Sequence, residues 1–231
     1  MRFKILFITL FISSFCFSQQ VNNQKTEIVK TNNGFQLLRN GKPYYVKGAG
    51  GTEYLDVLNS IGGNSIRTWS TGDAKTVLDD AYANGISVCL GLWVGHERHG
   101  FNYNDEYAIT AQLKAFEQDI LKYKDHPALL MWAIGNEVDL FYKNFRVWNA
   151  IEDIAKMIKE LDPNHPTMTV TAGIDPAEVF MIKEYCPSID ILGVNTYGGI
   201  KNLSDQVRMF NWEKPYMVTE WGPYGHWESP M

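Results

Sequence analysis

Cysteine is scarce in this sequence of 231 residues, which contains only three. Cys16 lies near the N-terminus, while Cys89 and Cys186 are too few for a disulfide framework and lack the spacing of metal ligands. We therefore expect both to be free thiols. The five histidines supply no metal pattern either, since His96 and His99 share one predicted loop without a wider set of ligands. The sequence predicts no metal and no cofactor.

Positive charge is also in short supply. The sequence contains 21 Lys and Arg and 26 Asp and Glu, which gives a formal net charge of −5. Such a chain lacks the basic surface that binds a phosphate backbone, so no nucleic-acid partner is expected. A phosphate-binding glycine fingerprint is also missing after the first predicted strand, which argues against a dinucleotide-binding fold.

Long apolar runs are missing except at the N-terminus. Residues 1–18 combine basic Arg2 and Lys4, an apolar run from Ile5 and a small residue, Ser18, at a plausible cleavage site. This pattern predicts a secretory signal peptide, because the run is short for a membrane span. Its removal would change the formal net charge from −5 to −7, since two basic residues leave with it. We expect a secreted or periplasmic protein with no membrane contact after cleavage and no lipid anchor on Cys16.

Seven strand-like segments alternate with helix-like segments after a polar leader at 19–33. A hairpin over 34–44, turning at Asn40-Gly41, precedes the alternation. Apolar residues of the segment 144–161 recur at helical spacing, as in an amphipathic helix. Strands are predicted over 44–51, 64–69, 86–93, 129–134, 167–172, 189–195 and 216–220, and helices over 53–61, 73–83, 105–124, 144–161, 176–185 and 203–210.

The alternation predicts an α/β fold with a parallel sheet and helices outside it. We favour a TIM (β/α)8-type barrel over residues 34–231, which takes about 250 residues when complete. Only about seven β/α units are found, and the sequence ends eleven residues after Glu220. The expected barrel therefore lacks its eighth strand at the C-terminus, either because the chain is a fragment or because the barrel is open.

Two of the buried strands end in a carboxylate. The apolar run 129–134 leads to Asn136 and Glu137, and the run 216–219 leads to Glu220. Burying an unpaired polar group costs several kcal/mol, so these side chains are expected at the carboxyl ends of the strands, where barrel active sites lie. Most enzymes that cleave glycosidic bonds use two carboxyl groups that face each other across the bond. An aromatic content of 13% suits a cleft that stacks on sugars, although core packing also accounts for many aromatic residues.

Three stretches resemble the clan A glycoside hydrolases, retaining β-glycosidases built on (β/α)8 barrels. Residues 123–137, YKDHPALLMWAIGNE, look like the fourth-strand signature of that clan. Residues 35–48 resemble the barrel entry of family 2 and related enzymes, including family 5-like domains, and residues 159–166, KELDPNHP, resemble their approach to the fifth strand. The resemblance covers nearly all of the chain after the leader.

The resemblance implies roles for individual residues. Glu137 would be the general acid/base and Glu220 the nucleophile, while Asn136 would bind the sugar 2-hydroxyl. Arg67 and Tyr197 would hold the nucleophile, although from the residues alone Arg67 could equally be a structural ion-pair partner. An eighth strand would normally add a tryptophan under the sugar. Aromatic residues in or near carboxyl-end loops are further candidates for substrate contact: Trp69, Trp93, His96, Trp221 and Trp227.

These expectations describe a retaining β-glycoside hydrolase whose partner is a β-linked oligo- or polysaccharide, with a lean toward β-glucan. Three alternatives stay open. A transglycosylase would use the same residues and pass the sugar to a hydroxyl instead of water, and a non-catalytic carbohydrate-binding barrel would not need both carboxylates. A metal-dependent barrel hydrolase would be sensitive to chelators. The sugar, the linkage and the oligomeric state are not predicted.

Overall fold

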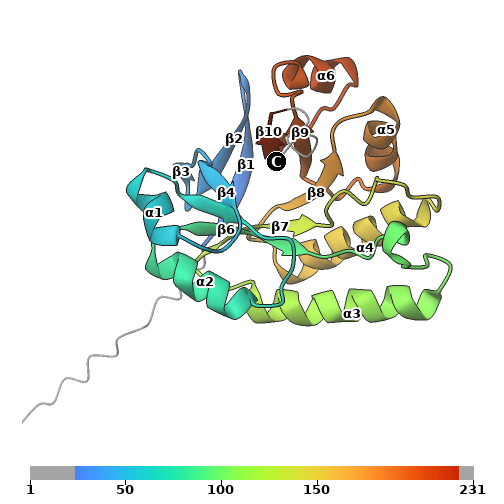
Figure 1. Ribbon diagram of the computed structural model, residues 1–231, viewed down its shortest axis with the longest axis horizontal. Helices are drawn as coiled ribbons and strands as arrows, with labels where there is room; N and C mark the ends of the chain where they lie inside the picture. Colours follow the sequence, from blue (N-terminus) through green and yellow to red (C-terminus); the bar gives the residue numbers. More distant parts are fainter. Residues whose placement is uncertain (1–23, 224–231) are drawn as a thin grey trace, which may run out of the picture.

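The computed structural model describes residues 24–223 and shows an open α/β barrel (Figure 1). Seven parallel strands follow one another in the order β10-β9-β8-β7-β6-β5-β4. The expected TIM-type fold with a parallel sheet of seven strands is therefore confirmed, and six of these strands are followed by a helix within residues 24–223. The strands are β4 (Gly48–Gly50), β5 (Ser65–Arg67), β6 (Ser87–Leu92), β7 (Leu129–Ile134), β8 (Thr167–Ala172), β9 (Ile191–Tyr197) and β10 (Tyr216–Gly222).

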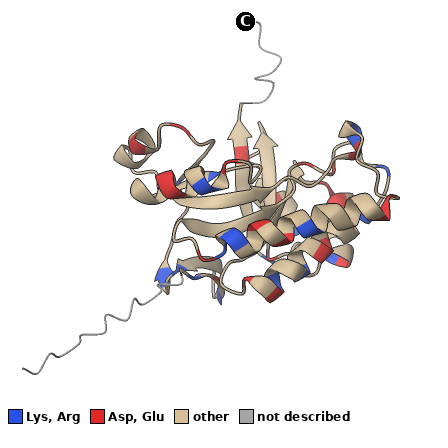
Figure 2. Cartoon of the chain, turned by 90° about the horizontal axis from the view of Figure 1, so that it is seen from below, with Lys and Arg blue, Asp and Glu red and all other residues tan. Residues whose placement is uncertain are grey.

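The helices lie outside the sheet, with α2, α3 and α4 along one side in Figure 1. They are α1 (Leu55–Ser60), α2 (Ala74–Ala83), α3 (Glu106–Tyr123), α4 (Arg146–Leu161), α5 (Pro176–Tyr185) and α6 (Leu203–Met209), with a 3-10 turn at Glu97–His99. Asp105 begins α3 because its carboxylate accepts hydrogen bonds from the N–H groups of Tyr107 and Ala108. Lys, Arg, Asp and Glu are spread mainly over the helices, while the strands carry few (Figure 2). No helix of residues 24–223 is both long and apolar enough to cross a bilayer.

A separate antiparallel sheet precedes the barrel. It contains β1 (Thr26–Thr31), β2 (Gly34–Arg39) and β3 (Lys42–Pro43) in the order β1-β2-β3. Asn40 and Gly41 both have positive φ angles, 52° and 72°, as the predicted two-residue turn requires. The polar leader predicted over 19–33 thus contains a strand, and the first barrel strand, predicted over 44–51, is shortened to β4. The predicted signal peptide lies outside the described residues.

An apolar core lies on each face of the parallel sheet. Alternate residues of β7 point to opposite faces, so Trp132 and Ile134 join the core under the helices, while Met131 and Ala133 join the core inside the barrel. Residues of the N-terminal sheet, including Leu37, pack against the inner core. The amphipathic prediction for α4 is confirmed by burial of its whole apolar stripe: Val147, Trp148, Ile151, Ile154, Ala155 and Ile158.

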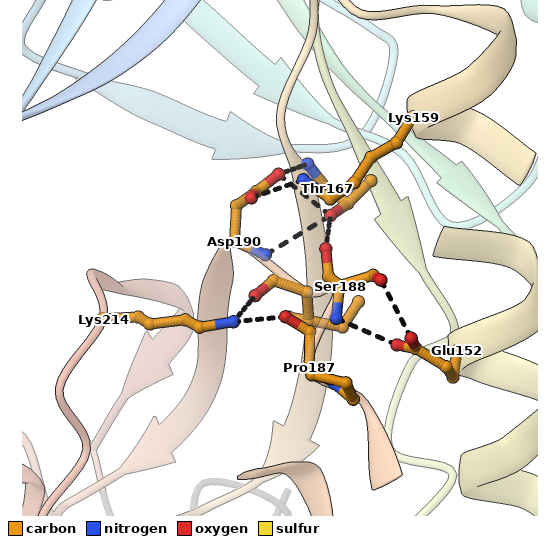
Figure 3. A network of polar contacts seen from close by, with 8 residues as sticks. Glu152, Lys159, Thr167, Pro187, Ser188, Asp190 and Lys214 are labelled. Atoms are coloured by element: carbon orange, nitrogen blue, oxygen red, sulfur yellow. Dashed lines mark hydrogen bonds and ion pairs between the residues drawn. The ribbon is translucent and has the colours of Figure 1, made fainter. Parts of the chain in front are cut away.

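A polar network ties α4 to the chain that leads into β9 (Figure 3). Glu152 is 5% exposed and accepts hydrogen bonds from the backbone N–H and hydroxyl of Ser188 at 2.9 and 2.8 Å. Oδ2 of Asp190 accepts a hydrogen bond from the Thr167 N–H at 2.9 Å, and Oδ1 of Asp190 accepts one from Nζ of Lys159 at 2.7 Å. These contacts join the amino ends of the strands, opposite the rim where Asn136 and Glu137 emerge.

Candidate active site

Glu137 lies where the chain leaves β7. Gly135 has a φ of 74°, a left-handed conformation that glycine adopts without strain, and it turns the chain sharply after Ile134. Glu137 itself has a φ of 52°, which is uncommon for a residue with a side chain. Its N–H donates to the Val170 carbonyl at 2.9 Å, so β8 holds this turn in place. Such backbone outliers gather at functional sites.

Glu220 lies within β10, at a break in the ladder with β9. The pairing register shifts between Val218 and Glu220, which forms a bulge. Between them, Thr219 donates from its hydroxyl to Oδ1 of Asn195 at 2.8 Å. Bulges re-aim side chains, and this one directs the Glu220 carboxylate toward Arg67 and Tyr197.

Arg67 joins the two carboxylate-bearing strands. It ends β5 and is 6% exposed. Its Nη1 donates to Oε1 of Glu220 at 2.8 Å, and its Nη2 donates to Oδ1 of Asn136 at 2.7 Å. One guanidinium therefore fixes the positions of residues that are 153 and 69 positions away in the chain.

The Glu220 carboxylate receives two more hydrogen bonds. Nε1 of Trp69 donates to Oε1 at 3.0 Å, and the hydroxyl of Tyr197 donates to Oε2 at 2.9 Å. Burial opposes ionisation of Glu220, but the hydrogen bonds from Trp69, Tyr197 and Arg67 together with the Arg67 charge outweigh it and lower its pKa. Glu220 is thus held as a carboxylate, the form that a nucleophile requires.

Glu137 has a partner that the sequence interpretation missed. Nδ2 of Asn195 donates to Oε1 of Glu137 at 2.7 Å and lies 3.3 Å from Oδ1 of Asn136. Asn195 is 3% exposed and lies in β9, two residues before Tyr197. A polar amide directly after the apolar run 191–194 is the signal that could have identified it, as with the two carboxylates.

Two hollows meet at Glu220. The smaller pocket, of about 600 Å³, contains both carboxylates and is lined from the ends of β7, β8, β9 and β10. The larger hollow, of about 1430 Å³, lies between the edge strands β4 and β10 and reaches the inner core. Tyr197 and Glu220 line both. The residues around the smaller pocket are Glu137, Leu140, Ala172, Gly173, Ile174, Asn195, Thr196, Tyr197, Gly199, Gln206 and Glu220.

Of the other aromatic residues predicted to contact substrate, some line a hollow and others do not. Trp93 and His96 stack with their ring centroids 4.9 Å apart, and neither lines either hollow. Burial and the nearby Arg98 and His99 lower the pKa of His96 to about 4, so its ring is neutral at pH 7. Trp221 is 69% exposed and lines the larger hollow. Trp227 lies outside the described residues.

Asp139 is a further acidic group near Glu137. Its carboxylate oxygens accept from the Ala172 N–H at 3.0 and 3.1 Å, which attaches the loop after β7 to the end of β8. Burial raises its pKa to about 7, with smaller contributions from Glu178 and Glu137. Within residues 24–223, no three His, Cys, Asp or Glu side chains are grouped closely enough to hold a metal ion.

The sequence is similar to a known family and to known proteins. The model of the family described as "Glycosyl hydrolases family 2, TIM barrel domain" matches residues 55–226. A beta-glucuronidase from Paenibacillus borealis is 27% identical over 82% of this chain and 37% of its own length, and one from Chlorocebus aethiops is 24% identical over 81% and 32%. The chain thus spans about a third of the length of these relatives.

Solved structures share the fold. A beta-D-glucuronidase from Dictyoglomus thermophilum superposes with a TM-score of 0.67 at 22% identity, covering 86% of this chain and 39% of that one. An endo-1,4-beta-mannanase from Eisenia fetida gives 0.66 at 16% identity, covering 86% and 81%. At these identities the likeness concerns the fold alone, whereas the family match spans most of the sequence. The chain belongs to glycosyl hydrolase family 2, and it carries that family's TIM barrel domain.

Proposed function

We propose that this chain is the catalytic barrel of a retaining β-glycoside hydrolase. The observation that carries the proposal is that two carboxylates in one pocket have different hydrogen-bond donors. Glu220 receives hydrogen bonds from Arg67, Trp69 and Tyr197, whereas Glu137 receives one from the neutral amide of Asn195. A retaining mechanism asks for this division between an ionised nucleophile and an acid that exchanges a proton.

The proposed reaction takes two steps. Glu220 attacks the anomeric carbon while the bond to the leaving oxygen breaks and Glu137 gives that oxygen its proton. Glu137 then takes a proton from water, and the water oxygen displaces Glu220 from the anomeric carbon. Asn136 lines neither hollow, but its Oδ1 accepts hydrogen bonds from Arg67 and Asn195, and in this reaction its amide nitrogen would bind a sugar hydroxyl.

For the sugar, we propose a β-glucuronide as the first candidate, because the relatives reported above are named beta-glucuronidases. The expected lean toward β-glucan finds no support among them. A neutral β-glycoside is the second candidate, and one observation favours it. Among residues 24–223, Arg67 is the one Lys or Arg that lines either hollow, and it is already bonded to Glu220 and Asn136. A uronate carboxylate would need a cation from elsewhere in the protein.

The test is a screen of 4-nitrophenyl β-glycosides, including the glucuronide, glucoside, galactoside and mannoside, with the wild type and two variants. Glu220→Gln is expected to abolish turnover of every substrate. Glu137→Gln is expected to lose most turnover of 4-nitrophenyl glycosides but to retain more with 2,4-dinitrophenyl glycosides, whose leaving group needs little protonation. Glu53→Gln, in an exposed loop at the same rim, is the matched control. Unchanged turnover in either active-site variant would contradict the mechanism, and sugar binding without any turnover would favour a non-catalytic barrel.

We also propose that the protein is exported, on the pattern of residues 1–18. Fusing this segment to a reporter enzyme that is active only outside the cytoplasm tests the proposal, with Ile5→Asp as the variant that interrupts the apolar run. Equal reporter activity in both fusions would contradict it.

A further inference from the structure

The two carboxylates determine which end of a bound glycoside lies against which wall of the smaller pocket. The nucleophile attacks the anomeric carbon on the face opposite the leaving group, and the general acid protonates the leaving oxygen. If Glu220 and Glu137 have these roles, the leaving group lies against the wall next to Glu137. That wall comes from the connections that follow β7 and β8.

The wall next to Glu137 is apolar. Leu140 supplies it from the loop after β7, and Ile174 supplies it from the loop after β8, together with the small residues Ala172 and Gly173. Leu140 and Ile174 are both half-buried, so part of each side chain is available for contact. Apart from Glu137 and Glu220 themselves, no charged side chain of residues 24–223 lines this pocket.

Hydrogen bonds attach the loop that carries Leu140 to its surroundings. The Leu140 N–H donates to the Glu137 carbonyl at 3.2 Å, and the Asp139 carboxylate bonds the Ala172 N–H. The next residue, Phe141, has a φ of 60° and is 77% exposed. A bulky residue in this left-handed conformation costs free energy, and such backbone outliers cluster at ligand-binding and active sites.

Building on the proposed glycosidase activity, we propose that the smaller pocket binds an apolar aglycone, an aryl or alkyl group, through Leu140 and Ile174. A sugar in this position would instead require hydrogen-bonding groups on the wall that it faces, because its hydroxyl groups lose water on binding. Besides the two carboxylates, the polar residues that line the pocket come from β9 and α6 rather than from the loops after β7 and β8: Asn195, Thr196, Tyr197 and Gln206.

The test compares two leaving groups of nearly equal acidity, 4-methylphenol and 4-tert-butylphenol, on the sugar that the screen identifies. Because the demand for protonation is the same, a difference in kcat/KM reports contact with the added methyl groups. Burial of one methylene is worth about fourfold in affinity, and the tert-butyl group adds three carbon atoms, so contact with one to three of them predicts a rise in kcat/KM between about fourfold and sixtyfold for the tert-butylphenyl glycoside. This ratio should fall toward one in Leu140→Ser and in Ile174→Ser.

Leu121→Ser is the matched control, since Leu121 is 50% exposed on the outer helix α3, and it should keep the wild-type ratio. A second arm measures the β-glycosyl fluoride of the same sugar, whose leaving group cannot contact the wall. Turnover of the fluoride with a leaving-group ratio near one would overturn the aglycone proposal and leave the glycosidase intact, as would faster cleavage of a disaccharide than of either aryl glycoside. No turnover of the fluoride or of either aryl glycoside would overturn the glycosidase itself.

Discussion

The guanidinium of Arg67 lies 2.8 Å from the carboxylate of Glu220, and the strands that carry them, β5 and β10, lie at opposite ends of the open sheet with only β4 beyond β5. The ion pair is largely buried, with 8% and 21% of the two side chains exposed. An ion pair of this kind holds a nucleophile ionised and fixes its direction. It also joins two distant parts of the barrel wall.

Replacing Arg67 should therefore affect the acidic side of the pH profile. In Arg67→Met, loss of the positive charge raises the pKa of Glu220, so the acidic limb of kcat/KM should move to higher pH and activity at pH 6 should fall by about a hundredfold or more. Arg67→Lys keeps a charge but cannot bond Glu220 and Asn136 with a planar fork, so we expect a smaller shift and a large loss of kcat. A profile that keeps its shape in Arg67→Met would refute the assigned role.

Tyr197→Phe removes a single donor to the same carboxylate. Burial and the hydrogen bond to Glu220 raise the pKa of Tyr197 to about 12, so the phenol stays protonated and keeps donating at neutral pH. A hydrogen bond to a charged group is worth about 1.5–3 kcal/mol, which predicts a fall in kcat/KM of roughly ten- to a hundredfold. Tyr185→Phe, at the end of α5, should behave like the wild type. Steady-state kinetics of both variants on one aryl glycoside test this prediction, and equal kcat/KM values for the two variants would contradict it.

Asp139 should make the stability of the protein depend on pH. Its pKa is about 7 in the folded state against 3.8 for an ordinary aspartate, so between about pH 4 and pH 7 the folded protein holds a proton that the unfolded chain has lost. Stability from this group is then highest below pH 4, decreases as pH rises to about 7, and stays constant above that.

Asp139→Asn removes this titration while leaving an oxygen that accepts from the Ala172 N–H. The variant should therefore gain stability relative to the wild type as pH rises from 4 to 7. Urea unfolding of both proteins at pH 4, 5.5, 7 and 8 measures the difference. A difference that does not change over this range would show that Asp139 has an ordinary pKa in the folded protein.

Glu152→Ala should reduce stability without changing the active site. The variant leaves the backbone N–H and hydroxyl of Ser188 without their acceptor in a partly buried place, which predicts a loss of about 1–3 kcal/mol in the free energy of unfolding. Lys156→Ala removes only the 3.3 Å ion pair between an exposed ammonium group and Glu152, whose carboxylate keeps its bonds to Ser188, and should cost about 1 kcal/mol or less. Urea denaturation compares the two, and equal losses would mean that the Ser188 contacts contribute little.

Local patterns were sufficient to predict most of the barrel. The apolar run before Asn136 became β7, and the spacing in 144–161 became the buried face of α4, because burial on one or two faces leaves a direct periodicity in the sequence. The strand β1 was missed because its residues are mostly polar and its pairing with β2 depends on the hairpin beside it.

The sequence by itself determined the order of the strands and which of them end in a carboxylate, since both follow from short apolar runs and the polar residues after them. Only the tertiary structure decided which side chains meet. Asn195 reaches Glu137, and Trp69 joins Arg67 at Glu220, while Trp93 and His96 stack together outside both hollows. These contacts depend on the curvature of the sheet, on the bulge in β10 and on the left-handed turn at Glu137, and these arise from contacts between residues far apart in the chain.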